Sequence, residues 1–191
     1  MKWFVLVFAI LFASLTPVFA QSAKGAIESE DPTEAEVGLY LVSLSDFDMA
    51  KQSYRAVFWA WFVHDDPEYK PIDSIEVINA RSTVKEFAYR NLINGQIIDG
   101  ARYTVEMQYA WDISFYPFDT QRFSLRFEDT DNTLEELTLS TDVQGSKLHP
   151  GLQLQGWQIL DFFGHETVST YPSSFGIPVA EGKTVTSRHA N

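Results

Sequence analysis

The chain has 191 residues, of which 26 are acidic and 14 are basic, for a formal charge of −12. This length supports one domain with a hydrophobic core, and a hydrophobic content of 45% is too high for a disordered protein. A nucleic-acid binder needs a basic surface, and no Lys/Arg cluster exists to form one, so nucleic acid is excluded as a partner. The sequence has no cysteine, which excludes disulfides, thiolate metal sites and a cysteine nucleophile.

Residues 1–20 have the pattern of a secretory signal peptide. Lys2 supplies the positive charge, Trp3–Leu15 is the apolar region, and Val18-Phe19-Ala20 is the small-residue cleavage site. The alternative is an uncleaved membrane anchor, but the apolar run is shorter than the ~20 residues that a spanning helix needs. We therefore expect a protein that is cleaved after Ala20 and exported to the periplasmic or extracellular face of the cell membrane.

Residues 21–36 are polar and predict a flexible leader, followed by a folded domain over 37–191. In this domain hydrophobic residues recur at every second position, which is typical of half-buried strands. Residues 38–44 and 54–63 are more continuously apolar, as expected where both faces of a strand are covered. Two alternating runs predict strands with one apolar face: Tyr103, Val105, Met107, Tyr109 and Trp111, and then Phe123, Leu125 and Phe127.

Turn signals divide these strands. Asn94-Gly95 and Asp99-Gly100 lie beside apolar runs and predict tight turns. No stretch has the pattern of a capped amphipathic helix. Many short strands with frequent turns indicate an all-β sandwich.

The segment Tyr116-Pro117-Phe118-Asp119-Thr120-Gln121 follows Trp111-Asp112-Ile113. This order of an aromatic residue, Pro-Phe-Asp and then Gln two residues on resembles the signature loop of pentameric ligand-gated ion channels. Animal members flank this loop with two cysteines, whereas bacterial members lack them, as this sequence does. The sequence thus resembles the extracellular ligand-binding domain of a bacterial, cysteine-less member of the Cys-loop receptor superfamily.

Other landmarks occur in the family's order from Val37 to Phe175. Residues 38–48 resemble the first strand and the loop after it, residues 75–81 the stretch with the first ligand-binding loop, and residues 156–159 the start of a late strand. The sequence departs from the family at His64-Asp65-Asp66, where Trp-x-Asp is usual, and at Tyr69-Lys70-Pro71, where Trp-x-Pro is usual. The family also continues into four membrane helices, so the resemblance implies a pore after Asn191.

The resemblance implies an immunoglobulin-like β-sandwich of the neurotransmitter-gated channel ligand-binding domain type. It also implies a homopentamer with a small-molecule ligand, such as a cationic amine, at each subunit boundary. The membrane would be reached through a pore domain that this sequence does not contain. No enzymatic activity, cofactor or metal is expected.

Three residues match ligand-binding positions of the family. Trp59 corresponds to an aromatic residue that faces the neighbouring subunit's pocket, where its ring would bind a cation. The alternative is that Trp59, like Trp61 on the same strand face, belongs to the core. Tyr171 and Phe175 correspond to the mobile loop that caps the pocket, and the alternative for them is an ordinary exposed hairpin.

Six residues match the region that couples ligand binding to the pore: Asp48, Tyr116, Pro117, Phe118, Asp119 and Gln121. In the family this loop contacts the membrane domain, Pro117 is cis, and the aspartate pairs with basic groups of the pore. The other role for Asp119 is to cap its own loop through side-chain hydrogen bonds, which is compatible with coupling.

Catalysis has little support in the sequence. His64-Asp65-Asp66 could be a metal or acid-base cluster, but we interpret it as a solvated strand end. The remaining histidines lack zinc-ligand spacing, and no nucleophile elbow or phosphate loop is present. Two alternatives stay open: a secreted pentamer without a pore, and a carbohydrate-binding or hydrolase β-sandwich that uses Trp and Tyr as sugar platforms.

Overall fold

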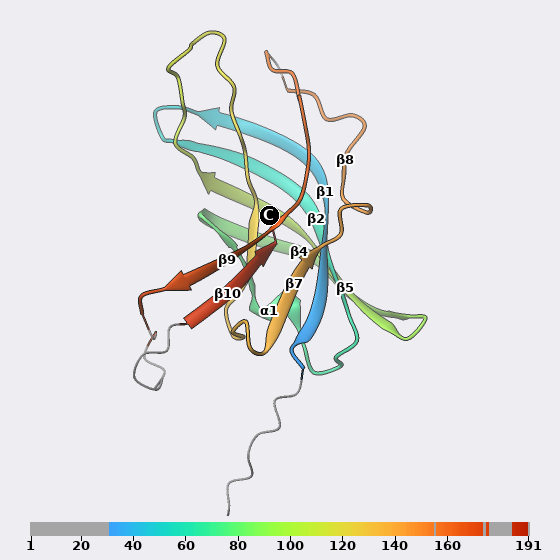
Figure 1. The fold of residues 1–191 in the computed structure, drawn as a ribbon. Coiled ribbons are helices and arrows are strands. Elements are labelled where there is room, and N and C mark those ends of the chain that lie inside the picture. The colour runs from blue at the N-terminus through green and yellow to red at the C-terminus, as the bar shows by residue number, and fades with distance from the viewer. Residues whose placement is uncertain (1–30, 155, 174, 176–184, 191) are drawn as a thin grey trace, which may run out of the picture. The chain divides into compact units, whose positions relative to one another are not determined.

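The computed structural model describes residues 31–154, 156–173, 175 and 185–190 (Figure 1). The predicted signal peptide, with its cleavage site after Ala20, lies outside these residues. The described residues form β-strands and one helix of four residues, so the predicted all-β fold is confirmed. Among them, no helix is long and apolar enough to cross a membrane.

The described strands form two sheets. One has six strands in the order β4-β5-β2-β1-β7, with β8 paired to β1, and the other has four in the order β3-β6-β10-β9. The elements are β1 (Thr33–Asp48), β2 (Ser53–His64), α1 (Pro71–Ser74), β3 (Ile75–Ile78), β4 (Ala80–Ile93), β5 (Gln96–Gln108), β6 (Arg126–Asp129), β7 (Leu137–Thr141), β8 (Lys147–Leu148), β9 (Glu166–Tyr171) and β10 (Val185–Ala190).

Strand β1 begins at Thr33, so it includes the last four residues of the predicted leader, which was expected to end at Glu36. Thr33 pairs with Leu137 in a parallel ladder between β1 and β7, and the side chain of Ala35 is fully buried. Residues 33–36 were predicted to belong to the leader because the segment around them is polar. Backbone pairing with β7 and the burial of Ala35 place them in a strand instead.

The two sheets share one hydrophobic core. On β2, alternate residues point inward, and Phe58 stacks against Tyr103 of β5 with ring centroids 5.3 Å apart. Phe127 of β6 meets Phe58 edge to face at 5.7 Å, so side chains of both sheets are in direct contact. A fully buried Phe contributes about 1.5–3 kcal/mol, and truncating one to Ala costs about 3–5 kcal/mol.

The prediction that the alternating run from Tyr103 to Trp111 forms one face of a strand is confirmed for its first three residues and wrong for Tyr109 and Trp111. Tyr103, Val105 and Met107 all lie in β5 and are buried in the core. The strand ends at Gln108, and Tyr109 packs just beyond it against Phe123 with ring centroids 4.9 Å apart. The second predicted strand is shorter than expected, because Phe123 and Leu125 precede β6 and pack on the core from a loop.

One predicted tight turn is confirmed and the other is wrong. Asn94-Gly95 joins β4 to β5, and both residues have positive φ (53° and 85°), as a two-residue hairpin turn requires. Asp99-Gly100 instead lies inside β5. Asp99 is there because its buried carboxylate accepts hydrogen bonds from the side chains of Arg90 and His64. Gly100 is there because a Cβ would collide with the ring of Tyr89.

Candidate functional site

Two glutamates face each other across adjacent strands of the four-stranded sheet. Glu76 of β3 is the direct cross-strand partner of Glu128 of β6. Their neighbours Val77 and Phe127 point into the core, so the glutamates lie on the opposite face of the sheet, where Glu76 is exposed and Glu128 is only 8% exposed. Like charges in direct opposition are unfavourable. We call Glu76 and Glu128 the acid pair.

An aromatic pair borders the acid pair. The hydroxyl of Tyr171 donates a hydrogen bond of 2.7 Å to Oε2 of Glu128. Burial, and then the Glu128 carboxylate, raise the pKa of Tyr171 to about 12, so the phenol stays a neutral donor at physiological pH. Phe175 meets the Tyr171 ring edge to face at 5.5 Å and is largely exposed. The two residues that the sequence placed at a lid thus lie together beside a carboxylate.

Trp59 lies on the outer surface of the six-stranded sheet. Its neighbours Phe58 and Ala60 point into the core and are fully buried, whereas Trp59 is half-buried on the other face of β2. Its ring centroid is 6.4 Å from that of Phe87 and 6.5 Å from that of Tyr89, both on β4. The core alternative for Trp59 is therefore wrong. We call Trp59, Phe87 and Tyr89 the aromatic face.

Arg102 of β5 lies within the aromatic face. It is the cross-strand partner of Trp59 on one side and of Glu86 on the other. Its Nε is buried and has no hydrogen-bond partner among the described residues. The aromatic face therefore includes one donor that lacks an acceptor, which is costly for a buried polar group.

Trp61 lies on the same face of β2 as Trp59, but its indole is hydrogen-bonded to Asp142, in the loop that follows β7. Its Nε1 donates to Oδ2 of Asp142 at 3.2 Å. The indole also covers Gly38, where a Cβ would overlap the ring. Trp61 is thus a packed residue and does not extend the aromatic face.

The predicted coupling loop is closed by the side chain of Gln121. Its Oε1 accepts a hydrogen bond from Tyr109 Oη at 3.0 Å. Its Nε2 donates to the backbone oxygen of Asp112 at 2.5 Å and to Oδ2 of Asp119 at 2.7 Å. Gln121 therefore joins both arms of the loop, and Asp119 makes the loop-capping contact expected of it.

The tip of this loop carries exposed aromatic rings. Phe115, Tyr116 and Phe118 have relative exposures of 77%, 70% and 89%. The Tyr116–Pro117 peptide bond is cis, as predicted. The loop tip therefore exposes apolar rings to solvent.

Asp48 lies next to the base of the coupling loop. Its backbone oxygen accepts a hydrogen bond from Trp111 Nε1 at 3.2 Å. Its carboxylate accepts from the backbone N–H of Lys51 at 2.8 Å and pairs with Lys51 Nζ at 3.1 Å, and these contacts lower the pKa of Asp48. The structure thus brings Asp48 to the loop through Trp111, while its carboxylate stays within the β1–β2 turn.

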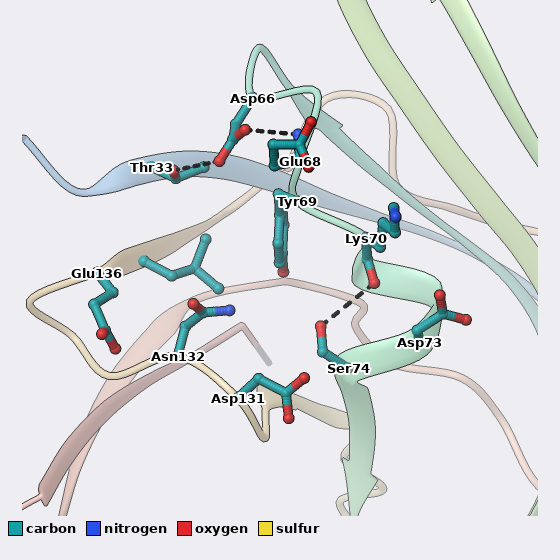
Figure 2. A pocket seen from close by; sticks show the side chains of 11 residues that line it. Thr33, Asp66, Glu68, Tyr69, Lys70, Asp73, Ser74, Asp131, Asn132 and Glu136 are labelled. Atoms are coloured by element: carbon teal, nitrogen blue, oxygen red, sulfur yellow. Dashed lines mark hydrogen bonds between the residues drawn. The ribbon is translucent and has the colours of Figure 1, made fainter.

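A cavity of about 420 Å³ lies between the start of β1, the segment 66–74 and the segment 131–137 (Figure 2). The sequence did not predict it. Within the described residues, no three acidic or histidine side chains lie close enough to hold a metal ion. Carboxylates predominate in its lining, which consists of Thr33, Asp66, Glu68, Tyr69, Lys70, Asp73, Ser74, Asp131, Asn132, Glu136 and Leu137.

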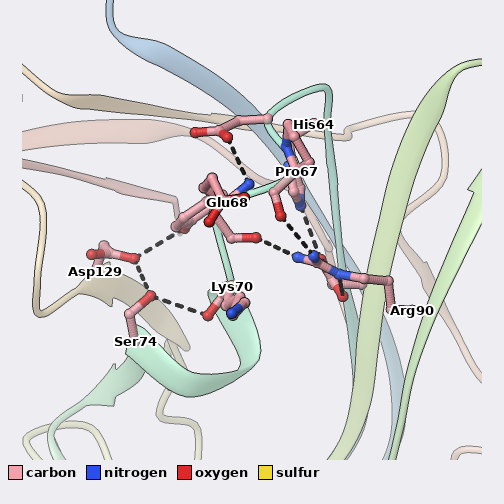
Figure 3. A network of polar contacts seen from close by, with 10 residues as sticks. His64, Pro67, Glu68, Lys70, Ser74, Arg90 and Asp129 are labelled. Carbon is pink, nitrogen blue, oxygen red and sulfur yellow. Dashed lines mark hydrogen bonds and ion pairs between the residues drawn. The ribbon is translucent and has the colours of Figure 1, made fainter.

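His64 is not the solvated strand end that the sequence predicted. It is 3% exposed, and its Nε2 lies 2.9 Å from Oδ2 of Asp99 (Figure 3). Arg90 donates from Nε to Oδ1 of Asp99 at 2.8 Å and from Nη2 to Oδ2 at 2.8 Å. The prediction failed because His64 is a hydrogen-bond partner of Asp99, a buried residue of β5. A buried carboxylate requires charged or polar partners, and these are then buried with it.

Tyr69 is the second centre of this polar network. Its hydroxyl donates to Oδ2 of Asp129 at 3.0 Å, and Ser74 donates to the same oxygen at 2.5 Å. Its backbone oxygen accepts a hydrogen bond from Arg90. Burial, followed by the Asp129 carboxylate, raises the pKa of Tyr69, so its hydroxyl remains a donor.

Sequence reasoning missed Glu76, Glu128, Phe87 and Tyr89. A charged residue flanked by apolar ones, as in Ile75-Glu76-Val77, indicates an outward position, but it does not identify the residue opposite. Cross-strand partners are set by strand register, which one sequence does not specify for strands distant in the chain.

No protein-family model matches this chain, and no curated protein matches it in sequence. The residues described above are therefore the basis for a functional assignment.

Proposed function

We propose that this chain is the ligand-sensing domain of a pentameric ligand-gated ion channel, and that it binds a cationic amine at the boundary between two copies. The observation that carries the proposal is the placement of two complementary surfaces on one domain. The acid pair with Tyr171 offers negative charge, and the aromatic face offers ring surfaces. Carboxylates and aromatic rings together are the groups that recognise an ammonium ion.

The two surfaces point in opposite directions. Each lies on the outer side of its own sheet, and the inner sides meet in the shared core. One chain therefore cannot close both surfaces around a single ligand, whereas two neighbouring copies can. This geometry supports a pocket at a subunit boundary, and a closed ring repeats that boundary at every subunit.

Arg102 is a cation beside Trp59, so it favours a ligand that places its ammonium group at the acid pair and an acceptor at the aromatic face. Its buried Nε lacks a partner among the described residues, and a hydroxyl or carboxylate of the ligand would supply one. The two-sheet core further supports an immunoglobulin-like β-sandwich of the neurotransmitter-gated type. The predicted signal peptide would place the domain outside the cytoplasmic membrane.

The exposed tip of the coupling loop favours a channel over a secreted binder without a pore. Phe115, Tyr116 and Phe118 are rings exposed to water in the isolated domain, and a membrane domain would cover them. Gln121 holds the loop closed, so the rings move with the strands that bear the loop.

The test is a titration of the chain with n-butylamine, with 1-butanol as the uncharged control. We expect saturable binding of the amine and none of the alcohol. Glu128→Gln should weaken binding by about ten- to a hundred-fold, because a hydrogen bond to a charged group contributes about 1.5–3 kcal/mol. The matched control Glu34→Gln, at an exposed position of β1, should bind as the unmodified chain does.

Mixing two defective variants tests where the pocket lies. Glu128→Gln and Trp59→Ala should each bind poorly alone. A mixture should regain part of the binding, because some boundaries then combine an intact Glu128 with an intact Trp59. If the mixture binds no better than its components, the pocket does not lie between copies.

A further inference from the structure

A chain of polar contacts crosses from one sheet to the other (Figure 3). On the six-stranded sheet, Asp99 of β5 accepts hydrogen bonds from His64 of β2 and Arg90 of β4. Arg90 then reaches out of the sheet and donates to the backbone oxygens of Pro67, at 3.1 Å, and of Tyr69. The guanidinium thereby fixes the segment that connects β2 to α1.

Tyr69 continues this chain into the four-stranded sheet. Its hydroxyl bonds to Asp129 at the end of β6, and Asp129 also accepts hydrogen bonds from Ser74 and from the backbone and side chain of Asn132. Tyr69 and Asp129 are both buried, so this contact is shielded from water. Tyr69 is therefore bonded to one sheet through its carbonyl and to the other through its hydroxyl. We call these contacts the Tyr69 bridge.

Each end of the Tyr69 bridge adjoins one of the two ligand surfaces. Asp129 directly follows Glu128 on β6, and the Asp129–Ile75 pair neighbours the acid pair in the same ladder. At the other end, Arg90 directly follows Tyr89 of the aromatic face. A displacement of the backbone at either surface thus moves a group of the bridge.

We propose that the Tyr69 bridge regulates the amine site by coupling the two surfaces of one subunit. The proposal rests on the proposed function, because it assumes that both surfaces bind ligand. In a ring, the aromatic face and the acid pair of one subunit belong to two different pockets. A ligand that shifts Tyr89 would move Arg90, and through Tyr69 the Asp129 end of β6. Filling one pocket then changes the affinity of the next pocket.

The variant that tests this most cleanly is Tyr69→Phe. It keeps the ring that packs against His64 at 5.1 Å and the carbonyl that Arg90 binds, and it removes only the hydroxyl. Tyr40→Phe is the matched control, because Tyr40 is a half-buried tyrosine on β1 outside the bridge. Arg90→Lys perturbs the other end, since an ammonium group cannot replace the planar fork of the guanidinium.

The first measurement is amide hydrogen exchange of β3 and β6 in the full chain without ligand. Arg90→Lys should speed exchange in these strands several-fold, although the substitution lies in the other sheet. In a Tyr69→Phe background the same substitution should add nothing, whereas in a Tyr40→Phe background it should act as before. The proposal would be overturned if Arg90→Lys had the same effect in the unmodified chain, in Tyr69→Phe and in Tyr40→Phe. It would also be overturned if the faster exchange were confined to β4 and β5. If Arg90→Lys does not fold, Asp99→Asn supplies the same comparison.

The second measurement is the steepness of n-butylamine binding. The unmodified chain should bind cooperatively, and Tyr69→Phe should bind with a Hill coefficient near one while retaining its affinity within a few-fold. Unchanged cooperativity in Tyr69→Phe would refute the bridge. If the unmodified chain does not bind the amine at all, the proposed function fails, and hydrogen exchange alone then decides whether the bridge links the two sheets.

Discussion

The indole of Trp61 lies directly over Gly38, its cross-strand partner in the β1–β2 ladder. A Cβ on Gly38 would overlap Cε2, Cζ2 and Nε1 of the indole. The ring cannot simply move aside, because its Nε1 is hydrogen-bonded to Asp142. Glycine is required at this position by space, since its φ is not in the left-handed region.

Gly38→Ala should therefore destabilise the domain by about 1–3 kcal/mol, the usual cost of overpacking. Urea denaturation followed by tryptophan fluorescence measures the change. Ser43→Ala, on the same strand, should change the stability by much less. A stability of Gly38→Ala equal to that of the unmodified chain would show that Trp61 is free to move.

Acid should weaken the domain partly through Asp99. Burial raises the pKa of this carboxyl, but hydrogen bonds from Arg90 and then His64 more than offset burial and lower the pKa below 3.8. A carboxyl whose pKa is lower in the folded state adds stability above its unfolded pKa and loses it as the pH falls through the folded pKa. This contribution should therefore disappear below about pH 4.

Asp99→Asn should lower the stability by about 1–3 kcal/mol at pH 7, because it removes the buried charged acceptor of the hydrogen bonds from Arg90 and His64. When the pH falls from 5 to 2, the stability of Asp99→Asn should decrease by less than that of the unmodified chain, because asparagine has no carboxyl group to protonate. Urea midpoints across this range, with Asp46→Asn as an exposed control, measure the difference. Parallel losses in both proteins would mean that Asp99 does not titrate in this range.

Asp119 should matter more for channel opening than for binding. Its carboxylate accepts a hydrogen bond from Gln121 inside the coupling loop, and Asp119 belongs to neither the acid pair nor the aromatic face. In a channel that carries this domain, Asp119→Ala should reduce the current evoked by agonist, while the domain binds ligand nearly as before. Patch-clamp recording and a binding titration on the same variant compare the two effects, and equal losses would assign Asp119 a structural role.

Export should remove the first twenty residues. Lys2, the apolar run to Leu15 and the Val-Phe-Ala site predict a mature protein that starts at Gln21. Intact mass spectrometry of the exported protein tests this directly. A product that retains Met1 would instead indicate the uncleaved anchor.

The fold class was predictable because alternation reports burial directly. Tyr103, Val105 and Met107 face the core as their spacing indicates, and Asn94-Gly95 forms the predicted hairpin turn. Strand β4 was not predicted, because its side chains are almost all exposed and therefore show no apolar period. Strand β4 is ordered mainly by backbone pairing with β5, and backbone pairing does not require any particular side chains.

The candidate site was less predictable than the fold. Trp59, Tyr171 and Phe175 were named from a resemblance, and the acid pair was not named at all. Glu76 and Glu128 are separated in the sequence by all of β4 and β5, so only the folded register places them in opposition. His64 was misinterpreted for a similar reason, because its partner Asp99 comes from a segment that looked like a turn.

The parallel pairing of β1 with β7 has a consequence for how the chain folds. β1 pairs with β2 through a short turn, so this hairpin can form as soon as both strands exist. The other edge of β1 pairs with Leu137–Thr141 of β7, and the ribosome synthesises this segment much later. Until β7 has been synthesised, the backbone N–H and C=O groups on this edge of β1 are unpaired and can bind a strand of another chain. We expect aggregation during synthesis to be most severe for nascent chains that end before β7, and to fall once β7 covers that edge.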